Sequence, residues 1–339
     1  MSWRTVDYHT AGEPFRIVVQ GPEIAGDTVL GRRQSARTAG GEADRVRALL
    51  CREPRGHAGM YGCYLVPPDP APDPAVTGVL FWHNDGFSTA CGHGTIALGC
   101  WAVDEGLVPA PDDGAVDVPL DVPSGRVVAT VLRSAGRTTA VRFTNVPSFP
   151  VARRLPATVG GRTVEVDVAW GGALYACMPA EALGLSVTTA DLSRLVEAAR
   201  EVQRVLDAHP ASRHPTDDRL SGIYGVVFFD ELGDTAAAVR QRTVTVFAAG
   251  QVDRSPCGSG TSARLALLHA DGRVGPSRPL EHRSIVDTVF TGRVLDRDGG
   301  RSWSGDPAVV TEVEGMARRT GEHRFVLDPE DELPQGFLL

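Results

Sequence analysis

Lysine is absent from this chain of 339 residues, so all 34 of its basic side chains are arginines. A pyridoxal phosphate Schiff base and the phosphate loop of nucleotide-binding enzymes both need a lysine side chain. Both kinds of site are therefore excluded. Any chemistry at the α-carbon of an amino acid has to proceed without pyridoxal phosphate as its electron sink.

Long apolar runs and basic stretches are also missing. No segment approaches the roughly 18 consecutive apolar residues of a membrane-spanning helix, and the N-terminal residues show no apolar signal core. The formal net charge is −8, and no basic stretch is longer than a pair such as Arg153-Arg154. We therefore expect a cytoplasmic protein that binds a small molecule, with neither nucleic acid nor a membrane as partner. Its oligomeric state stays open, a homodimer being one option.

Cysteine is scarce, with six residues at irregular spacing. This does not resemble a disulfide framework, so the thiols should be reduced. Four of them stand among apolar neighbours and are most simply explained as small buried hydrophobic residues: Cys51, Cys63, Cys100 and Cys177. The other two, Cys91 and Cys257, stand in glycine-rich segments.

Those two segments are copies of one another, 166 positions apart. One reads Cys91-Gly92-His93-Gly94-Thr95 and the other Cys257-Gly258-Ser259-Gly260-Thr261. Further matches at the same offset pair Phe81 with Phe247, Ala97 with Ala263, Gly106 with Gly272, and Val108 with Val274. Each copy reads as a strand, a tight turn with a cysteine, and a helix. Two halves related by a pseudo-twofold axis would bring two cysteines to one cleft.

The length also favours two domains, each large enough for its own core. Proline becomes frequent between Pro147 and Pro156, and we place the crossing there. The first domain then covers 1–150 and the second 151–317. The segment from about 318 to 339 could return to the first domain.

Hydrophobic patterns predict several elements. Strands are expected at 15–19, 79–82, 116–123, 126–133, 138–143, 163–169, 223–229 and 243–248, with a short helix at 42–51. A surface helix over 189–208 is indicated by an apolar stripe and a Thr189 cap. The segment after Cys91 is apolar on all sides, which is typical of a helix at the centre of a domain.

The glycine-rich turns predict that each thiol lies at the N-terminus of a helix. Unpaired N–H groups and the positive end of the helix dipole stabilise a thiolate there, and the same N–H groups can bind a carboxylate. A substrate carboxylate between two such helix starts would place its α-carbon between two sulfurs. One thiolate could then remove the α-proton while the opposite thiol delivers a proton to the other face.

Two polar residues lie close to these cysteines in sequence. Asp253 could hold the substrate's ammonium or imino group, and His93 could assist that contact or influence the nearby thiol. Each also has a structural explanation. Asp253 could instead cap the local backbone, and His93 could simply be a hydrogen-bonded residue of the core.

Two other sites compete for the same residues. Gly258, Gly260 and Ala263 fit a dinucleotide-binding fingerprint with Glu281 near the acidic position, but no clean strand precedes them. Cys91, His93 and Cys257 are possible zinc ligands, but no fourth ligand is evident.

The sequence resembles the proline racemase family. The matching segments are Asp253-Arg254-Ser255-Pro256-Cys257-Gly258-Ser259-Gly260-Thr261, Cys91-Gly92-His93-Gly94-Thr95, His9-Thr10-Ala11-Gly12-Glu13-Pro14 and Pro54-Arg55-Gly56-His57.

The resemblance implies a fold similar to diaminopimelate epimerase. Such a fold has two pseudo-symmetric α/β domains, each a largely antiparallel sheet around a central helix, with the active site between them. It further implies cofactor-independent racemisation or epimerisation with Cys91 and Cys257 as the two bases and no metal. The backbone of Gly92, His93, Gly258 and Ser259 would bind the carboxylate, and Asp253 and His93 the substrate nitrogen.

The family has three branches: proline racemases, 4-hydroxyproline 2-epimerases and trans-3-hydroxy-L-proline dehydratases. Met60-Tyr61-Gly62 and the run from His83 to Thr89 resemble the dehydratases, which characteristically carry threonine in place of the second cysteine. Because inversion needs an acid on the second face and elimination does not, Cys257 favours inversion.

Three further positions bear on the substrate. Ala90 stands where the family usually has methionine, and Asp287 where it usually has glycine, so both are able to reshape the pocket. Phe247 corresponds to an aromatic pocket position of the proline-specific branch. We expect a racemase or epimerase of proline or 4-hydroxyproline. The alternatives are a trans-3-hydroxy-L-proline dehydratase and a non-catalytic protein that binds imino acids.

Overall fold

The computed structural model describes residues 2–339, which divide into two compact units. Unit 1 comprises the chain up to Arg142 together with Met316–Leu339, and unit 2 is Phe143–Gly315. The chain passes from unit 1 to unit 2 within strand β8 (Arg137–Thr144). It returns directly after strand β17 (Pro307–Gly315).

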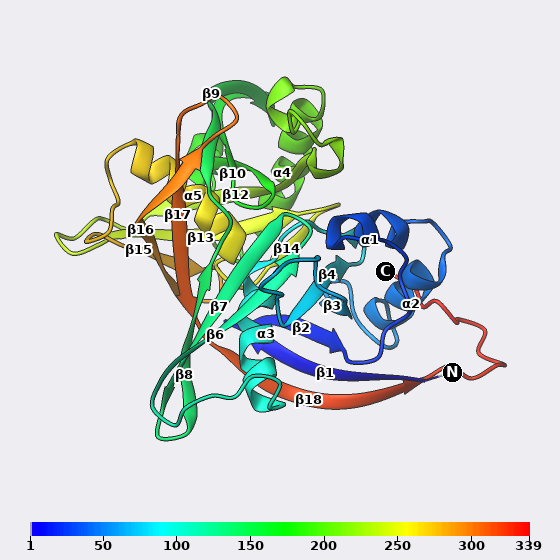
Figure 1. Ribbon diagram of the computed structural model, residues 1–339. Helices are drawn as coiled ribbons and strands as arrows, with labels where there is room; N and C mark the ends of the chain where they lie inside the picture. The colour runs from blue at the N-terminus through cyan, green and yellow to red at the C-terminus, as the bar shows by residue number, and fades with distance from the viewer. Residues whose placement is uncertain (1) are drawn as a thin grey trace. The chain divides into compact units, whose positions relative to one another are not determined.

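Unit 1 contains three helices and, besides β8, eight strands among its described residues (Figure 1). The helices are α1 (Val29–Ala36), α2 (Glu42–Cys51) and α3 (Gly92–Asp104). The strands are β1 (Ser2–Thr10), β2 (Glu13–Val18), β3 (Tyr61–Val66), β4 (Thr77–His83), β5 (Gly86–Phe87), β6 (Gly114–Val122), β7 (Gly125–Ser134) and β18 (Ala317–Val326).

Unit 2 contains two α-helices, α4 (Leu192–Asp207) and α5 (Gly258–Ala270), and three short 3-10 helices. The 3-10 helices are η1 (Ala180–Leu183), η2 (Pro210–Ser212) and η3 (Asp218–Leu220). Besides β17, its strands are β9 (Phe149–Val159), β10 (Arg162–Trp170), β11 (Leu174–Pro179), β12 (Ile223–Glu231), β13 (Val239–Phe247), β14 (Gln251–Asp253), β15 (Leu280–Ser284) and β16 (Val289–Arg301).

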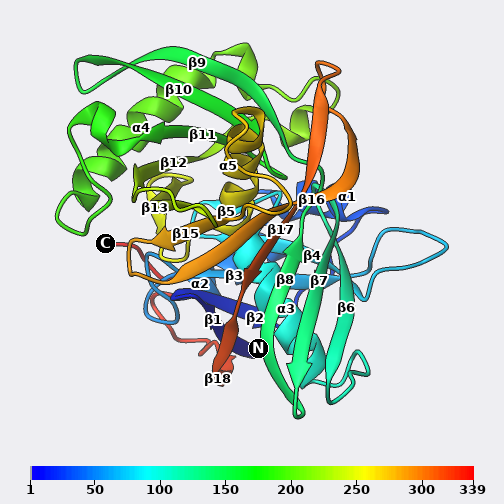
Figure 2. The ribbon, with the colours of Figure 1, turned by 90° about the vertical axis from the view of Figure 1, so that its left-hand side faces the viewer.

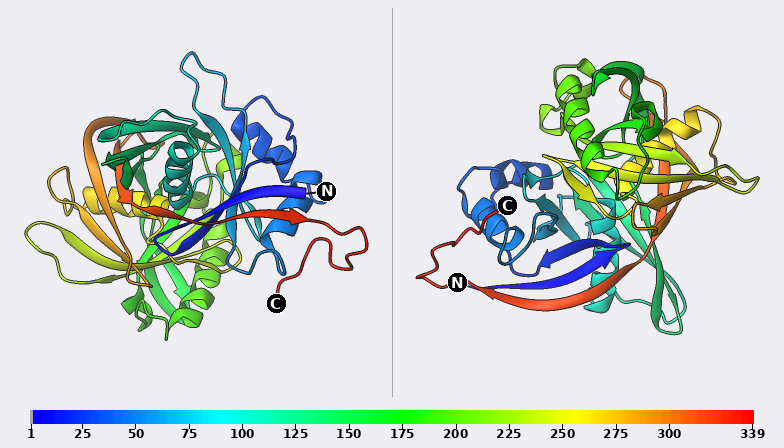
Figure 3. Two further views of the ribbon diagram at one scale, coloured as in Figure 1. Left: turned by 90° about the horizontal axis from the view of Figure 1, so that it is seen from below. Right: turned by 180° about the vertical axis from the view of Figure 1, so that it is seen from behind.

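The two units share one strand pairing scheme. In unit 1, β18 is antiparallel to β1, β1 to β2, β3 to β4, and β6 to β7, while β2 with β3 and β4 with β6 are parallel. In unit 2 the same sequence of pairings runs through β9, β10, β11, β12, β13, β15 and β16, with β11–β12 and β13–β15 parallel. Figure 3 shows β1 and β18 side by side, although they stand at opposite ends of the chain. The duplication seen in the sequence is therefore a duplication of the fold.

Each sheet wraps around one buried helix. All residues of α3 except Asp104 are buried, and all of α5 except His269 and Ala270. Helix α3 packs against β1, β2, β7 and β18, and α5 against β9, β10, β16 and β17 (Figure 2). Both helices have 13 residues and begin directly after a cysteine. The prediction of an α/β fold with a central helix in each half is confirmed, and the sheets are mixed, with two parallel pairings each.

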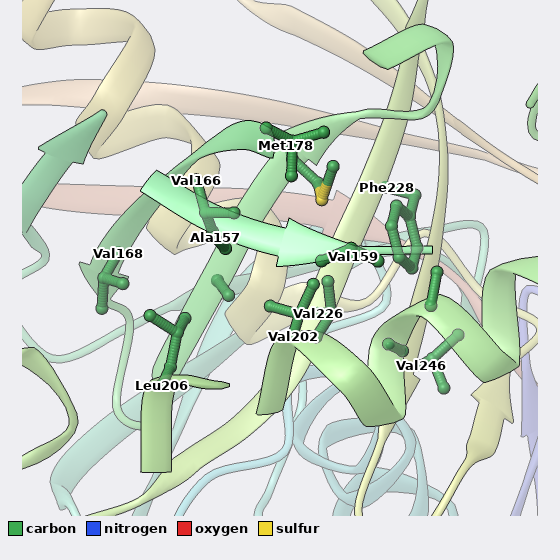
Figure 4. Close-up of a cluster of buried hydrophobic side chains, with 14 of the residues drawn as sticks. Ala157, Val159, Val166, Val168, Met178, Val202, Leu206, Val226, Phe228 and Val246 are labelled. Carbon is green, nitrogen blue, oxygen red and sulfur yellow. The ribbon is translucent and has the colours of Figure 1, made fainter. Parts of the chain in front are cut away.

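The outer face of each sheet is covered by further helices. In unit 1, α1 and α2 pack on β3 and β4 through a cluster that includes Leu50, Tyr64 and Trp82. In unit 2, Val202 and Leu206 of α4 lie in one cluster with Val226, Phe228 and Val246 of the sheet (Figure 4). Burial of these apolar faces fixes the helices to the sheet.

Two local predictions need correction. Helix α4 begins at Leu192 with Asp191 as its N-cap residue, so Thr189 is not the cap. We expected the domain crossing between Pro147 and Pro156, whereas the chain passes between the units within β8, and Pro150 and Pro156 belong to β9, which pairs with β10. Among residues 2–339, no helix has the length and apolar character needed to cross a membrane.

Candidate active site

Cys91 lies at the start of α3 and caps that helix with its sulfur. The Gly94 N–H donates to Sγ at 3.2 Å, and the two ring nitrogens of His93 lie 3.4 and 3.5 Å from the same atom. The residue is buried, with 5% of its surface exposed. Backbone N–H groups at a helix N-terminus favour negative charge, so the helix start would stabilise a thiolate at this position.

The His93 ring is fixed by aromatic neighbours. It lies edge-on to Phe15, with ring centroids 5.7 Å apart, and to Tyr61 at 4.8 Å. The Thr10 hydroxyl donates to the His93 carbonyl at 2.9 Å, which ties the first turn of α3 to β1. These contacts explain how the ring nitrogens are directed toward the sulfur of Cys91.

The two dehydratase-like segments meet at Tyr61. Its hydroxyl lies 2.6 Å from that of Ser88, and its ring is 5.7 Å from His83. Burial, together with the positive charges of Arg47 and Arg33, lowers the pKa of His83 to about 3. His83 is therefore neutral at physiological pH. The residues that support His93 thus come from the two segments that resemble the dehydratases.

Cys257 occupies the matching position at the start of α5, but its surroundings differ. It is buried with 6% exposed, and its backbone has φ +64° and ψ 105°. Burial raises the pKa of the Cys257 thiol, and the charge of Asp253 raises it further. The Gly260 N–H and the Thr245 hydroxyl oppose these effects without cancelling them. At neutral pH this group is a thiol, which is a proton donor.

Asp253 contributes one oxygen to a local turn. Its Oδ1 accepts hydrogen bonds from the Ser255 N–H at 2.8 Å and from the Ser255 hydroxyl at 2.7 Å. The capping role considered for this residue is therefore present in the structure. Its exposed fraction is only 2%, so its charge acts directly on the Cys257 thiol.

An aromatic row lies beside the start of α5. The Ser259 hydroxyl is 2.7 Å from that of Tyr175, whose ring is edge-on to Tyr224 at 5.8 Å. Tyr224 is stacked on Phe247 at 5.7 Å. Tyr175 and Tyr224 were not predicted, because isolated tyrosines in apolar strands carry no motif.

Gly92 and Gly258 are the first residues of the two helices, so their N–H groups belong to the first turn, where backbone donors have no intrahelical partner. The structure thus assembles two groups of predicted site residues. Cys91, Gly92 and His93 lie together in unit 1. In unit 2 the group comprises Cys257, Gly258, Ser259, Asp253 and Phe247.

Two observations concern the alternative zinc and dinucleotide sites. No group of three or more His, Cys, Asp or Glu side chains that could hold a metal ion is found within residues 2–339. Glu281, the acidic residue of the dinucleotide fingerprint, lies on β15 with its carboxylate 3.3 Å from Arg240.

The two departures from the family pattern differ in character. Ala90 is buried next to Cys91. Asp287 has φ +66°, in the left-handed region where glycine is favoured, and its exposed carboxylate pairs with Arg242 at 2.7 Å.

This fold, with a cysteine at the start of each central helix, defines a class of enzymes with duplicated α/β units. The family model described as "Proline racemase" matches residues 5–338, so the chain belongs to the proline racemase family.

Named relatives extend over nearly the whole chain. A trans-3-hydroxy-L-proline dehydratase of Bacillus cereus is 41% identical over 99% of this chain and 98% of its own. The human protein of the same name is 42% identical over 98% of this chain and 94% of its own.

Solved structures agree with the fold. A hydroxyproline epimerase from Agrobacterium vitis, with bound trans-4-hydroxy-L-proline, has a TM-score of 0.90 at 30% identity and covers 100% of this chain and 96% of its own. A probable proline racemase from Agrobacterium radiobacter, with bound carbonate, has a TM-score of 0.89 at 28% identity, covering 99% and 96%.

Proposed function

We propose that this protein inverts the α-carbon of proline or 4-hydroxyproline by proton transfer between the substrate and two thiols, without a cofactor. The observation that carries the proposal is a thiol placed directly before each of the two central helices. The Gly94 N–H and the His93 ring lie at the Cys91 sulfur, and the Asp253 carboxylate acts on the Cys257 thiol. A base and an acid are what an inversion requires.

The reaction begins with the substrate carboxylate bound by backbone N–H groups at the starts of α3 and α5, from Gly92, His93, Gly258 and Ser259. The Cys91 thiolate removes the α-proton, and the electron pair left on the α-carbon delocalises into the carboxylate. The Cys257 thiol then gives its proton to the opposite face, leaving Cys257 as thiolate and Cys91 as thiol. Asp253 and His93 hold the substrate nitrogen, and Phe247 faces the ring.

A second candidate is dehydration of trans-3-hydroxy-L-proline, and two observations favour it. The curated relatives named above are dehydratases at 41% and 42% identity, above the 30% and 28% of the epimerase and racemase structures. In addition, Tyr61 of one dehydratase-like segment contacts the His93 ring, and its hydroxyl is hydrogen-bonded to Ser88 of the other. Removal of the α-proton by Cys91 and loss of the 3-hydroxyl as water give an enamine, which tautomerises to a pyrroline carboxylate.

We rank inversion first because identity over the whole chain reports mainly on the scaffold, while the reaction depends on the groups that reach the substrate. The acid needed for the second face is present as Cys257. A protein that only bound an imino acid would need no thiol at either helix start.

The decisive experiment offers the purified protein L-proline, trans-4-hydroxy-L-proline and trans-3-hydroxy-L-proline in deuterated water. Chiral chromatography detects inversion with gain of α-deuterium, and o-aminobenzaldehyde detects a pyrroline carboxylate. Inversion of either of the first two substrates supports the proposal. Dehydration of the third alone supports the second candidate, and binding without turnover of any of them supports the non-catalytic alternative.

Variants at the second thiol sharpen this result. Cys257→Thr should abolish inversion because threonine cannot supply an acid of comparable strength. Cys91 remains able to take a proton, so dehydration of trans-3-hydroxy-L-proline should persist or rise in this variant. Cys100→Ala, which removes a buried thiol from the middle of α3, is the matched control and should keep the wild-type product pattern.

A further inference from the structure

The two copies of the cysteine motif differ at one peptide group. Cys257 has φ +64° and ψ 105°, whereas Cys91 has φ −157° and ψ 104°. Because only φ differs, the Pro256–Cys257 peptide is turned over relative to the Ala90–Cys91 peptide. A residue other than glycine pays a conformational cost at such a φ, so neighbouring groups must hold it there.

Two hydroxyl groups hold both ends of this peptide. The Cys257 N–H donates to the Ser255 hydroxyl oxygen at 3.1 Å, and the Thr261 hydroxyl donates to the Pro256 carbonyl at 3.2 Å. In the other copy, Thr95 matches Thr261 in sequence but donates instead to the carbonyl of Cys91, at 2.8 Å. The same residue type therefore fixes two different peptide orientations.

Each hydroxyl is itself oriented by a buried partner. Ser255 donates its hydroxyl proton to Asp253 at 2.7 Å, which leaves its oxygen free to accept from Cys257. Thr261 lies 2.8 Å from Nδ1 of His282, which has no exposed surface.

The direction of the bond between His282 and Thr261 follows from counting protons. Thr261 has one hydroxyl proton and gives it to Pro256, so Nδ1 of His282 must carry the proton between them. Nε2 of His282 has no hydrogen-bond partner among residues 2–339. With the proton on Nδ1, Nε2 is a bare acceptor, whereas the other tautomer would bury an N–H without an acceptor.

We propose that Ser255, Thr261 and His282 form a peptide clamp that holds the Pro256–Cys257 peptide turned over and so positions the Cys257 thiol. The inference rests on the proposed function in one respect: the thiol that the clamp positions is the acid of the inversion. The three side chains are positioning residues that act through Cys257. Without the clamp, the backbone of Cys257 relaxes to a negative φ and its sulfur leaves the reacting position.

The kinetic test uses three variants. Thr261→Val removes the hydroxyl but keeps the side-chain shape, and Thr261→Ser retains the hydroxyl. Ser262→Ala is the matched control, because the Ser262 hydroxyl donates to the Gly258 carbonyl at 3.2 Å on the same helix without touching the clamped peptide. In Thr261→Val, kcat for inversion should fall about 100-fold with KM within about twofold of wild type. Thr261→Ser should recover most of kcat, and equal rates in Thr261→Val and Ser262→Ala would overturn the proposal.

A structural test needs no substrate and separates this proposal from the proposed function. Crystal structures of the wild type and of Thr261→Val should show a positive φ at Cys257 in the first and a negative φ in the second. A positive φ in both, or a negative φ in the wild type, refutes the clamp whatever the activity. A wild type that inverts no substrate refutes the proposed function, while the φ comparison still decides the clamp. If Thr261→Val does not fold, Ser255→Ala removes the other hydroxyl and is judged by the same two measurements.

Discussion

Acid should destabilise this protein through two buried histidines. His83 in unit 1 and His282 in unit 2 have 4% and 0% of their surface exposed, and the pKa of each is lowered to about 3, chiefly by burial. In the unfolded chain a histidine has a pKa of about 6.5. Between about pH 6.5 and about pH 3 the unfolded state therefore binds more protons, so stability is lost as the pH falls through that window.

The magnitude follows from the same linkage. Between pH 7.5 and pH 5, one histidine that stays neutral in the folded state costs about 2 kcal/mol in the free energy of unfolding. At pH 5 this loss of about 2 kcal/mol barely depends on the pKa of the histidine in the folded state, provided that this pKa lies below about 4. His83 and His282 together account for about 4 kcal/mol.

The assay is urea unfolding of the wild type and of His282→Asn at pH 7.5 and pH 5. The asparagine Nδ2 can replace Nδ1 as donor to Thr261, but the side chain does not titrate. The stability of the variant relative to the wild type should rise by about 2 kcal/mol on going to pH 5. The Ser262→Ala variant, which removes no titratable group, should keep a constant difference from the wild type. A constant difference for His282→Asn as well would show that His282 is protonated in the folded state, contrary to the reasoning.

Three further substitutions test other features. Cys91→Ser should lower inversion measured by chiral chromatography at least about 1000-fold, because a serine hydroxyl is a far weaker base, and near wild-type turnover would contradict the mechanism. Gly94→Ala would place a Cβ 2.5 Å from the Phe15 ring and 2.9 Å from the Cys91 sulfur. It should cost about 1–3 kcal/mol in urea unfolding, and an unchanged midpoint would count against this packing. Asp287→Gly relieves a positive φ but loses the exposed ion pair with Arg242, so it should stabilise by about 0–1 kcal/mol in thermal unfolding; a clear loss would contradict the estimate.

Much of the fold was predictable because its signals are local. The apolar run after Cys91 and the matching segment after Cys257 identified the two central helices, and the repeat predicted that the halves share a fold. Strand β9 was not predicted because proline has no backbone N–H to donate and is therefore uncommon in paired strands. Pro150 and Pro156 nevertheless lie in β9, opposite Ala169 and Glu165 of β10.

The site was predictable only where its contacts are short in sequence. His93 and Cys91 are two positions apart, so their proximity was expected. The pairs Tyr61 with Ser88 and Tyr175 with Ser259 are separated by 27 and 84 positions, and no spacing rule connects them.

The backbone of Cys257 was beyond prediction for a similar reason. The two cysteine motifs are nearly identical in sequence, yet one peptide is turned over. His282, which orients Thr261, stands 21 positions after it, on β15. Local sequence therefore specifies that a cysteine precedes each helix, while a residue on another strand orients the side chain that fixes the Cys257 backbone.

The pairing of β1 with β18 has a consequence for how the protein is made. Strand β1 pairs on one side with β2, which follows it directly, but on the other side with Ala317–Val326, which is synthesised only after all of unit 2. Phe143–Gly315 emerges as an uninterrupted segment and can fold while synthesis continues. Unit 1 therefore gains its last strand only after the whole of unit 2 has been synthesised, so the half that carries Cys91 is completed after the half that carries Cys257.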